Sequence, residues 1–181
     1  MNALIIYDST GGNTEKVAQA IYEISAQAMQ SQIVKVDKNT DIDLLNHDLI
    51  FIGSPVIDWL PTKAMMNFVR KSMKAYNAKN LIQPSAPIRP GKFVVSFGTF
   101  AGPHTGKREA RPMVMWLRCA LEHIGYLSLA AWLVVGQFNT MKGLNKGGRL
   151  GDIENRPNEN DLNDVRNKTA GVIASLGAWR H

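Results

Sequence analysis

The sequence has a single cysteine, Cys119, so it cannot form a disulfide within the chain or supply a set of thiolate ligands for zinc. It also lacks a long apolar run. The longest, Leu129–Val135, is far shorter than the roughly 20 residues that a membrane-spanning helix requires. The first residues show no basic segment followed by an apolar core, as a secretory signal would. We therefore expect a cytoplasmic protein without a membrane span.

Positive charge is present but not concentrated. Lysine and arginine number 21 against 15 aspartate and glutamate, which gives a formal net charge of +6. The longest basic runs are pairs, Arg70-Lys71 and Lys107-Arg108, and not the dense basic stripe typical of nucleic-acid binding. We expect no nucleic-acid partner. The charge is consistent either with a solvated surface or with a preference for an acidic partner or ligand.

The length of 181 residues and the apolar content of 45% are typical of one globular domain, which we place over residues 1–181. Short apolar runs alternate with segments whose apolar residues recur at helical spacing. Strands are predicted at residues 3–7, 33–36, 49–52, 93–97 and 129–135, and helices at 13–29, from Thr62 onward, at 107–124 and from about Asn158 onward.

This alternation predicts right-handed strand–helix–strand crossovers and therefore an α/β fold. We expect a three-layer, doubly wound domain in which a five-stranded parallel sheet lies between helices. Residues 75–91 hold three prolines and are expected to form a surface loop, and residues 41–45 replace a full helix with about one turn. Residues 137–157 form a long, glycine-rich loop, and loops of that length are usually functional or mobile.

The segment between the first strand and the first helix has the composition of an anion site. It reads Asp8-Ser9-Thr10-Gly11-Gly12-Asn13-Thr14-Glu15. In an open α/β sheet, ligands bind beyond the carboxyl ends of the strands, and a helix N-terminus there offers free N–H groups and a favourable dipole. The hydroxyls can donate hydrogen bonds, and the glycines let an anion approach the backbone closely.

The same loop lacks the residues of two common nucleotide motifs. It has no lysine, so it is not a Walker loop, and it has no Gly-x-Gly-x-x-Gly pattern, so it is not a dinucleotide fingerprint. A phosphate monoester held by hydroxyls and a helix end fits it better. The alternative is a plain capped helix, because serine, threonine, asparagine and glycine are also common N-cap residues.

The order of the residues adds a resemblance to a known family. Residues 5–21 resemble the signature that flavodoxins carry around the phosphate of FMN: two aliphatic residues and an aromatic one, then Ser9, Gly12, Thr14, Ala18 and Ile21 at the defined positions. The alternation of strands and helices extends the resemblance over nearly the whole chain. It implies the flavodoxin-like fold with strand order 2-1-3-4-5 and FMN bound without a covalent link. The residues it assigns to FMN in this loop are Ser9, Thr10, Gly11, Gly12, Asn13 and Thr14.

The resemblance implies that two further loops form the walls of the flavin ring site. The loop after the third strand supplies Pro55, Val56, Ile57, Asp58 and Trp59, and the loop after the fourth strand supplies Thr99, Phe100, Ala101, Gly102 and His104. Trp59 can stack on the flavin or pack against the next helix. Phe100 replaces the tyrosine common in electron-carrier flavodoxins, which leaves the second stacking contact open. His104 can donate to a flavin carbonyl, take part in proton transfer, or be an ordinary surface histidine.

Other residues are assigned to packing or to surface charge. Cys119 lies between Leu117 and Leu121 in a predicted helix, and we expect it in the core. Trp116, Trp132 and Trp179 are also expected to pack. The acidic residues from 152 to 164 are interpreted as loop and helix N-terminal charge and not as metal ligands. We assign no catalytic side chain and no metal site.

Bound FMN would supply redox chemistry that the protein tunes. The first function to consider is an electron-transfer protein that carries one or two electrons between redox partners. The alternative is an FMN-dependent oxidoreductase acting on NAD(P)H, a quinone or a porphyrinogen, with Lys142, Lys146 and Arg149 near a small redox substrate. A third is a binding domain that has lost FMN. Electron-carrier flavodoxins are typically acidic, whereas this chain is basic, so a partner protein is expected to be acidic.

Overall fold

The computed structural model describes residues 1–177, so Trp179 lies outside the described residues. One parallel sheet forms its centre, in the order β2-β1-β3-β4-β5, which confirms the predicted fold class and strand order. Its strands are β1 (Asn2–Tyr7), β2 (Gln30–Lys35), β3 (Leu49–Pro55), β4 (Phe93–Phe100) and β5 (Leu127–Val135). The helices are α1 (Asn13–Ala28), α2 (Lys63–Ala78), α3 (Arg111–His123), α4 (Leu144–Gly147) and α5 (Glu159–Leu176), with 3-10 turns η1 (Leu44–Asn46) and η2 (Gly106–Glu109).

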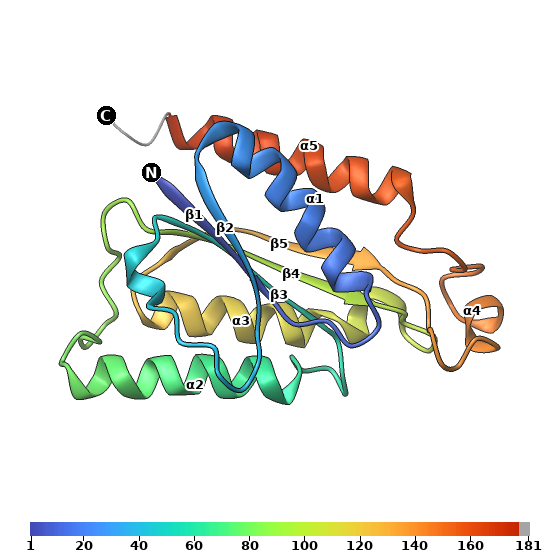
Figure 1. Cartoon of the computed structure of the whole chain (residues 1–181). Coiled ribbons are helices and arrows are strands. Elements are labelled where there is room, and N and C mark those ends of the chain that lie inside the picture. Colours follow the sequence, from blue (N-terminus) through green and yellow to red (C-terminus); the bar gives the residue numbers. More distant parts are fainter. Residues whose placement is uncertain (178–181) are drawn as a thin grey trace.

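Helices cover both faces of the sheet (Figure 1). The two faces hold separate apolar cores, because successive side chains of a strand point to opposite sides. On β1, Leu4 and Ile6 pack with α2 and α3, whereas Ile5 and Tyr7 pack with α1 and α5. The central strands are buried on both faces, and this explains why they are continuous apolar runs in the sequence.

The predicted helix 107–124 is in fact two elements. Residues 106–109 form η2, and the α-helical part begins only at Arg111. Pro112 lies in the first turn of α3, where a residue without an N–H is tolerated because that group would have no partner within the helix. The loop 137–157 likewise contains the short helix α4, which its glycine content did not predict.

The prediction that Cys119 lies in the core is wrong: its side chain is exposed. Leu117 and Leu121 are fully buried, but residues two apart on a helix differ by about 200° in direction, so Cys119 points away from both. Trp132 is buried as expected, and its ring lies 5.9 Å from that of Phe51.

Two predicted helix starts are confirmed by side-chain caps. The Thr62 hydroxyl accepts a hydrogen bond from the N–H of Met65 at 3.2 Å, and Asn158 forms a capping box with Asp161. Asp161 also pairs with Arg156. Within residues 1–177 no three metal-ligating side chains gather, and none of the helices combines the length and apolar character needed to cross a membrane.

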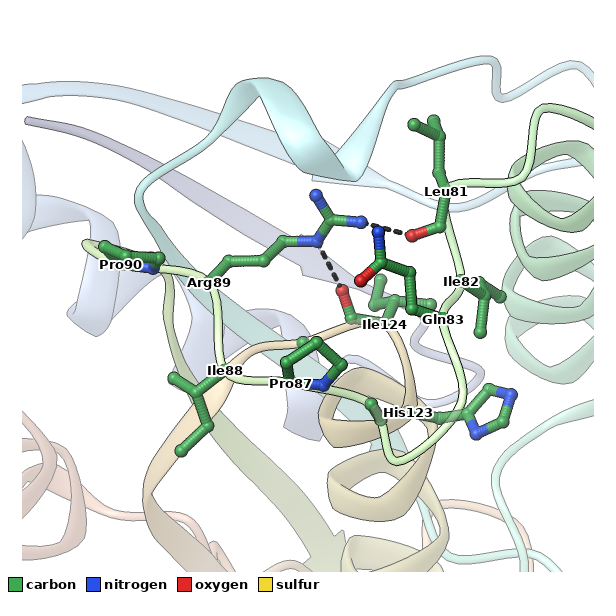
Figure 2. Close-up of a pocket in the computed structure, with 11 residues that line it drawn as sticks. Leu81, Ile82, Gln83, Pro87, Ile88, Arg89, Pro90, His123 and Ile124 are labelled. Carbon is green, nitrogen blue, oxygen red and sulfur yellow. Dashed lines mark hydrogen bonds between the residues drawn. The ribbon is translucent and has the colours of Figure 1, made fainter.

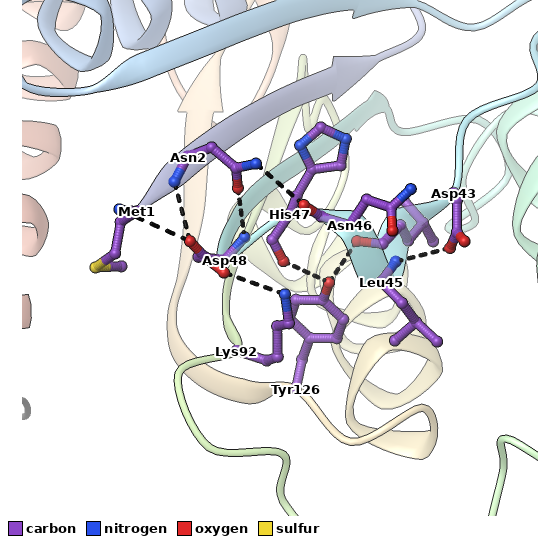
Figure 3. Close-up of polar contacts among 10 residues, drawn as sticks. Met1, Asn2, Asp43, Leu45, Asn46, His47, Asp48, Lys92 and Tyr126 are labelled. Atoms are coloured by element: carbon purple, nitrogen blue, oxygen red, sulfur yellow. Dashed lines mark hydrogen bonds and ion pairs between the residues drawn. The ribbon is translucent and has the colours of Figure 1, made fainter.

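At the amino ends of the strands, Asp48 links three strands (Figure 3). Its carboxylate accepts hydrogen bonds from the N–H of Asn2 on β1 at 3.0 Å and from Lys92, just before β4, at 3.1 Å. The N-terminal ammonium lies 3.9 Å away. Partial burial acts to raise the pKa of the Asp48 carboxyl, but the bonds from Lys92 and Asn2 outweigh burial and hold that pKa below its usual value.

Because the folded-state pKa of Asp48 is lowered, the ionised carboxylate stabilises the fold at neutral pH, and this contribution disappears as the pH falls below about 4. We expect Asp48→Asn to lower the free energy of unfolding by about 1 kcal/mol at pH 7, since the site is partly exposed, and to have little effect at about pH 3. Urea denaturation at both pH values measures this. Asp41→Asn, at an exposed ion pair, is the control and should change little at either pH. A deficit that persisted undiminished at low pH would contradict the assignment.

Candidate functional site

Two adjoining cavities lie beyond the carboxyl ends of the central strands, where the order of the strands reverses between β1 and β3. One has a volume of about 440 Å³ and the other about 290 Å³, and they share Val56, Phe100, Ala101 and Phe138. The predicted site residues that line one or both cavities are Thr10, Gly11, Asn13, Pro55, Val56, Ile57, Asp58, Trp59, Thr99, Phe100, Ala101, Gly102 and His104. The loops after β1, β3 and β4 therefore meet at one place, as expected.

The loop after β1 is open to a ligand. Gly12 adopts a left-handed conformation with φ 85° and starts α1 without a side-chain cap. Within the described residues, the backbone N–H groups of Thr10, Gly11, Asn13 and Thr14 have no hydrogen-bond partner. These are the donors that a phosphate at a helix N-terminus would use. The larger cavity borders this loop, and no lysine or arginine lines it.

Two of the three hydroxyls of this loop point inward. The Ser9 hydroxyl accepts hydrogen bonds from the N–H groups of Gly12 at 3.1 Å and Glu15 at 3.3 Å, so it shapes the turn. The Thr14 hydroxyl is buried and lies 2.8 Å from that of Thr99 on β4. Thr10 is exposed, and its hydroxyl has no partner within residues 1–177. Thr10 is therefore the hydroxyl of the loop best placed to meet a ligand.

Buried polar contacts tie this loop to the loop after β3. The Thr62 hydroxyl, which caps α2, donates to the Asp8 carboxylate at 2.5 Å, and the N–H of Thr62 donates to the Ser54 hydroxyl at 3.0 Å. The N–H of Asp8 donates to the carbonyl of Gly53 at 3.0 Å. These groups are shielded from water, so the contacts fix the two loops relative to each other.

A tight hairpin presents Trp59. The N–H and C=O of Ile57 pair with those of Leu60, both at 2.9 Å, and the two residues between them have positive φ, 48° for Asp58 and 66° for Trp59. The indole is 61% exposed and lines the smaller cavity. This exposure leaves its surface available to a ligand and disfavours the alternative in which Trp59 is buried against α2.

In the loop after β4, Phe100 is nearly buried but reaches the walls of both cavities. Gly102 has φ 52°, and a Cβ there would lie 2.9 Å from the carbonyl oxygen of Gly106, so the turn requires glycine. His104 is exposed and lines the smaller cavity, and its N–H donates to the carboxylate of Glu109.

The residues after β5 that close the larger cavity are not among the predicted site residues. Asn13 donates to the carbonyl of Gln137 at 2.8 Å, and Asn139 donates to the carbonyl of Gly11, so two asparagines link this segment with the loop after β1. Phe138 lies between the two cavities and lines both. Its position directly after a parallel strand was the available signal, because that edge is where ligands bind.

Asn145 of α4 holds Phe138 in place. Its side chain is buried, accepts a hydrogen bond from the N–H of Phe138 at 2.8 Å, and donates to the carbonyl of the same residue at 3.1 Å. The amide therefore satisfies both backbone groups of Phe138, as a neighbouring strand would. The segment 137–157 is therefore an ordered wall of the site.

A third cavity, of about 160 Å³, lies at the opposite edge of the sheet, beside the amino ends of β4 and β5 (Figure 2). The guanidinium of Arg89 donates to the carbonyls of Ile124 and Leu81. Figure 2 shows this arginine bridging the two segments while His123 points away from it. Arg89 is thus used to hold the loop 81–90, and the cavity lies away from the carboxyl edge of the sheet where ligands bind, so we do not take it as the candidate site.

The chain is similar to proteins of one known fold. Residues 4–86 match the family model of the flavodoxin domain. Solved structures with the same fold include a flavodoxin from the domain Archaea, with 18% identity, a TM-score of 0.65, and coverage of 98% of this chain and 99% of that one. Flavodoxin 1 from Bacillus cereus has 16% identity, a TM-score of 0.68, and coverage of 96% and 98%.

A flavodoxin, WrbA-like protein from Agrobacterium tumefaciens has 17% identity, a TM-score of 0.67, and coverage of 99% of both chains. Identities this low show the fold alone. No curated protein sequence matches the chain significantly. The fold is flavodoxin-like, and the match over residues 4–86 confirms the predicted resemblance to the flavodoxin family. FMN is the cofactor of that family, which supports FMN as the ligand of the site.

The residues present fit FMN. The four unpaired N–H groups and the Thr10 hydroxyl offer donors for a phosphate at one end, and the second cavity, with Trp59 and Phe138, offers flat apolar surface at the other. Burial, together with a hydrogen bond to Glu15, raises the pKa of Tyr7 to about 12, so this phenol beneath the loop stays neutral and adds no charge.

We expect Asn145→Ala to loosen the segment 137–141, because the N–H and C=O of Phe138 would lose their partners. The free energy of unfolding should fall by about 1–3 kcal/mol, and the amide of Phe138 should lose protection in hydrogen exchange. Asn160→Ala, at an exposed position of α5, is the control and should change neither. Unchanged exchange at Phe138 would show that Asn145 does not hold this wall.

Proposed function

We propose that this protein binds FMN at the carboxyl edge of its sheet and works as an electron-transfer protein, carrying one or two electrons between redox partners. The observation that carries the proposal is the loop after β1, which borders a cavity of about 440 Å³ and has four backbone N–H groups without a hydrogen-bond partner among residues 1–177. Bound FMN would supply the redox chemistry, and the chain would position and shield it.

In this proposal the phosphate of FMN lies at the start of α1. The backbone N–H groups of the loop and the hydroxyl of Thr10 would donate to it, and the α1 dipole would favour its negative charge. Ser9 and Thr14 act indirectly, since their hydroxyls hold the turn and join it to β4. The loop residues assigned to the cofactor are Ser9, Thr10, Gly11, Gly12, Asn13 and Thr14.

The flavin ring would occupy the second cavity and the junction between the two. Trp59 would supply one face, and the backbone of the loop after β4 would bind the polar edge of the ring. Phe138 is the aromatic side chain that we add to this set. The other residues assigned here are Pro55, Val56, Ile57, Asp58, Thr99, Phe100, Ala101, Gly102 and His104.

One observation favours an FMN-dependent oxidoreductase as a second candidate. His104 is exposed on the wall of the ring cavity and can exchange a proton with a small substrate there. Steady-state assays with NAD(P)H and a quinone or a porphyrinogen separate the two candidates. Turnover that His104→Gln abolishes would favour the enzyme, and absence of turnover in protein that holds FMN would favour the carrier.

The phosphate site is tested by comparing FMN with riboflavin, which lacks the phosphate. We expect the native chain to bind FMN much more tightly than riboflavin. Thr10→Val should weaken FMN binding by about 1.5–3 kcal/mol, or about 10- to 150-fold in Kd, because a hydrogen bond to a charged group is lost. Riboflavin affinity should not change. Fluorescence titration measures both. Equal affinities of the native chain for the two ligands would show that this loop does not bind the phosphate.

The ring site is tested at Trp59. Stacking on an electron-rich indole disfavours the reduced, more negative flavin, so Trp59→Ala should raise the two-electron midpoint potential by about 10–30 mV, the equivalent of about 0.5–1.5 kcal/mol. It should also reduce the quenching of flavin fluorescence on binding. Ile88→Ala, at an exposed position beside the opposite edge of the sheet, is the control. If both quantities stayed at their native values in the Trp59 variant, the indole would not contact the ring.

A further inference from the structure

Large apolar side chains gather on the surface around the candidate site. Five of the eight exposed large hydrophobic residues of the described chain lie there, and we call them the apolar rim: Ile57, Trp59, Leu60, Met141 and Leu144. The hairpin after β3 carries three of them, and Ile57 and Met141 line the same cavity. The N–H of Leu144 donates to the carbonyl of Met141 at 3.0 Å, which places Leu144 one turn further on.

Exposed apolar side chains cost free energy in water, and a group of them beside a ligand site is typical of a surface that binds another molecule. A small substrate would be held inside a cavity. Trp59, Ile57 and Leu60 are instead between 40% and 61% exposed on a protruding hairpin. The apolar rim therefore has the character of the centre of a protein–protein interface.

Basic side chains surround this centre. Lys142 follows Met141 directly, and Lys107 and Arg108 lie on η2, between residues that line the ring cavity. Arg149 lies close to the loop after β4, because its backbone N–H donates to the carbonyl of Pro103 at 2.9 Å. Its side chain also passes beside Gly106: a Cβ atom placed on that glycine would lie 3.9 Å from the Cδ of Arg149. All four are exposed, and within residues 1–177 none forms an ion pair.

Nearby acidic groups offset part of this charge. The Glu109 carboxylate accepts from the N–H groups of His104 and Thr105, and Glu154 is paired with Lys146 at 3.0 Å. Asp152 accepts from the N–H of Glu154 at 2.9 Å. Asp58, at the tip of the hairpin, is the remaining acidic group on the walls of the ring cavity. With Lys146 included, five basic side chains stand against four acidic ones here, so the surface keeps a small positive excess, of the same sign as the net charge of +6.

We infer that the apolar rim and its four basic neighbours form the docking surface for a redox protein whose own redox centre is surrounded by acidic side chains. This inference rests on the proposed function and names the kind of partner that it requires. Opposite charge would steer the two proteins together and orient them, and the apolar rim would exclude water at the contact. An exposed edge of the cofactor site would then face the partner.

The test uses two probe proteins and the full chain: a [2Fe–2S] ferredoxin chosen for a strongly negative net charge, and cytochrome c, which is strongly positive. Isothermal titration calorimetry measures binding to the chain with and without FMN. We expect the ferredoxin to bind, with a Kd that rises about tenfold or more between about 20 mM and about 300 mM salt, because screening weakens the attraction. Cytochrome c should not bind.

Two double variants carry the same change in charge. The first, Lys142→Glu with Arg149→Glu, alters the docking surface. The second, Lys74→Glu with Lys79→Glu, alters exposed lysines toward the far end of α2. Lys74 lies about 16 Å along the helix axis from Lys63, the first residue of α2. The first pair should weaken ferredoxin binding about tenfold or more, and the second much less. FMN affinity, measured by fluorescence, should stay unchanged in both, which also shows that the variants fold.

Each result has a separate meaning. Equal loss of binding in the two double variants would show that only the total charge matters and would overturn the docking surface. The docking surface would also be overturned if the ferredoxin did not bind, or if only cytochrome c bound, to protein that takes up FMN. That result would leave the proposed function intact. Failure to take up FMN would overturn the proposed function, and ferredoxin binding by the chain without FMN would still report on the surface.

Discussion

The candidate site depends on hydrogen bonds between loops that follow different strands. Thr62 and Asp8 join the loops after β3 and β1, Thr14 and Thr99 join α1 to β4, and Asn13 joins the loop after β1 to the segment after β5. A parallel sheet places these loops at one edge but does not fix their positions relative to one another. The cross-links do so, and they leave N–H groups of the loop after β1 free for a ligand.

The two ends of the site differ in character. The end near α1 is assembled from backbone groups held by buried hydroxyl and carboxylate contacts, so its geometry is set before a ligand arrives. The other end is made of exposed side chains on a hairpin and on the segment after β5. This division suits a protein that holds its cofactor at one end and presents it to another molecule at the other.

The strands and helix caps could be read from the sequence because their signals are local. Buried parallel strands are short apolar runs, and Thr62 and Asn158 are cap residues directly before helical patterns. Contacts between distant residues gave no such signal: Asn13 and Gln137 are 124 positions apart. At Cys119 the apolar neighbours in sequence suggested burial, although the position of this residue around the helix places it in solvent.

Trp59 lies in a backbone conformation that few side chains adopt readily, next to Asp58 in the same region. A glycine at position 59 would relieve this conformational cost and remove a large apolar group from water. Thermal stability alone would therefore favour glycine, whereas recognition of a flat ring favours an aromatic residue. Under the proposed function, position 59 is a place where folding and ligand recognition would compete, and tryptophan is the residue that recognition would favour.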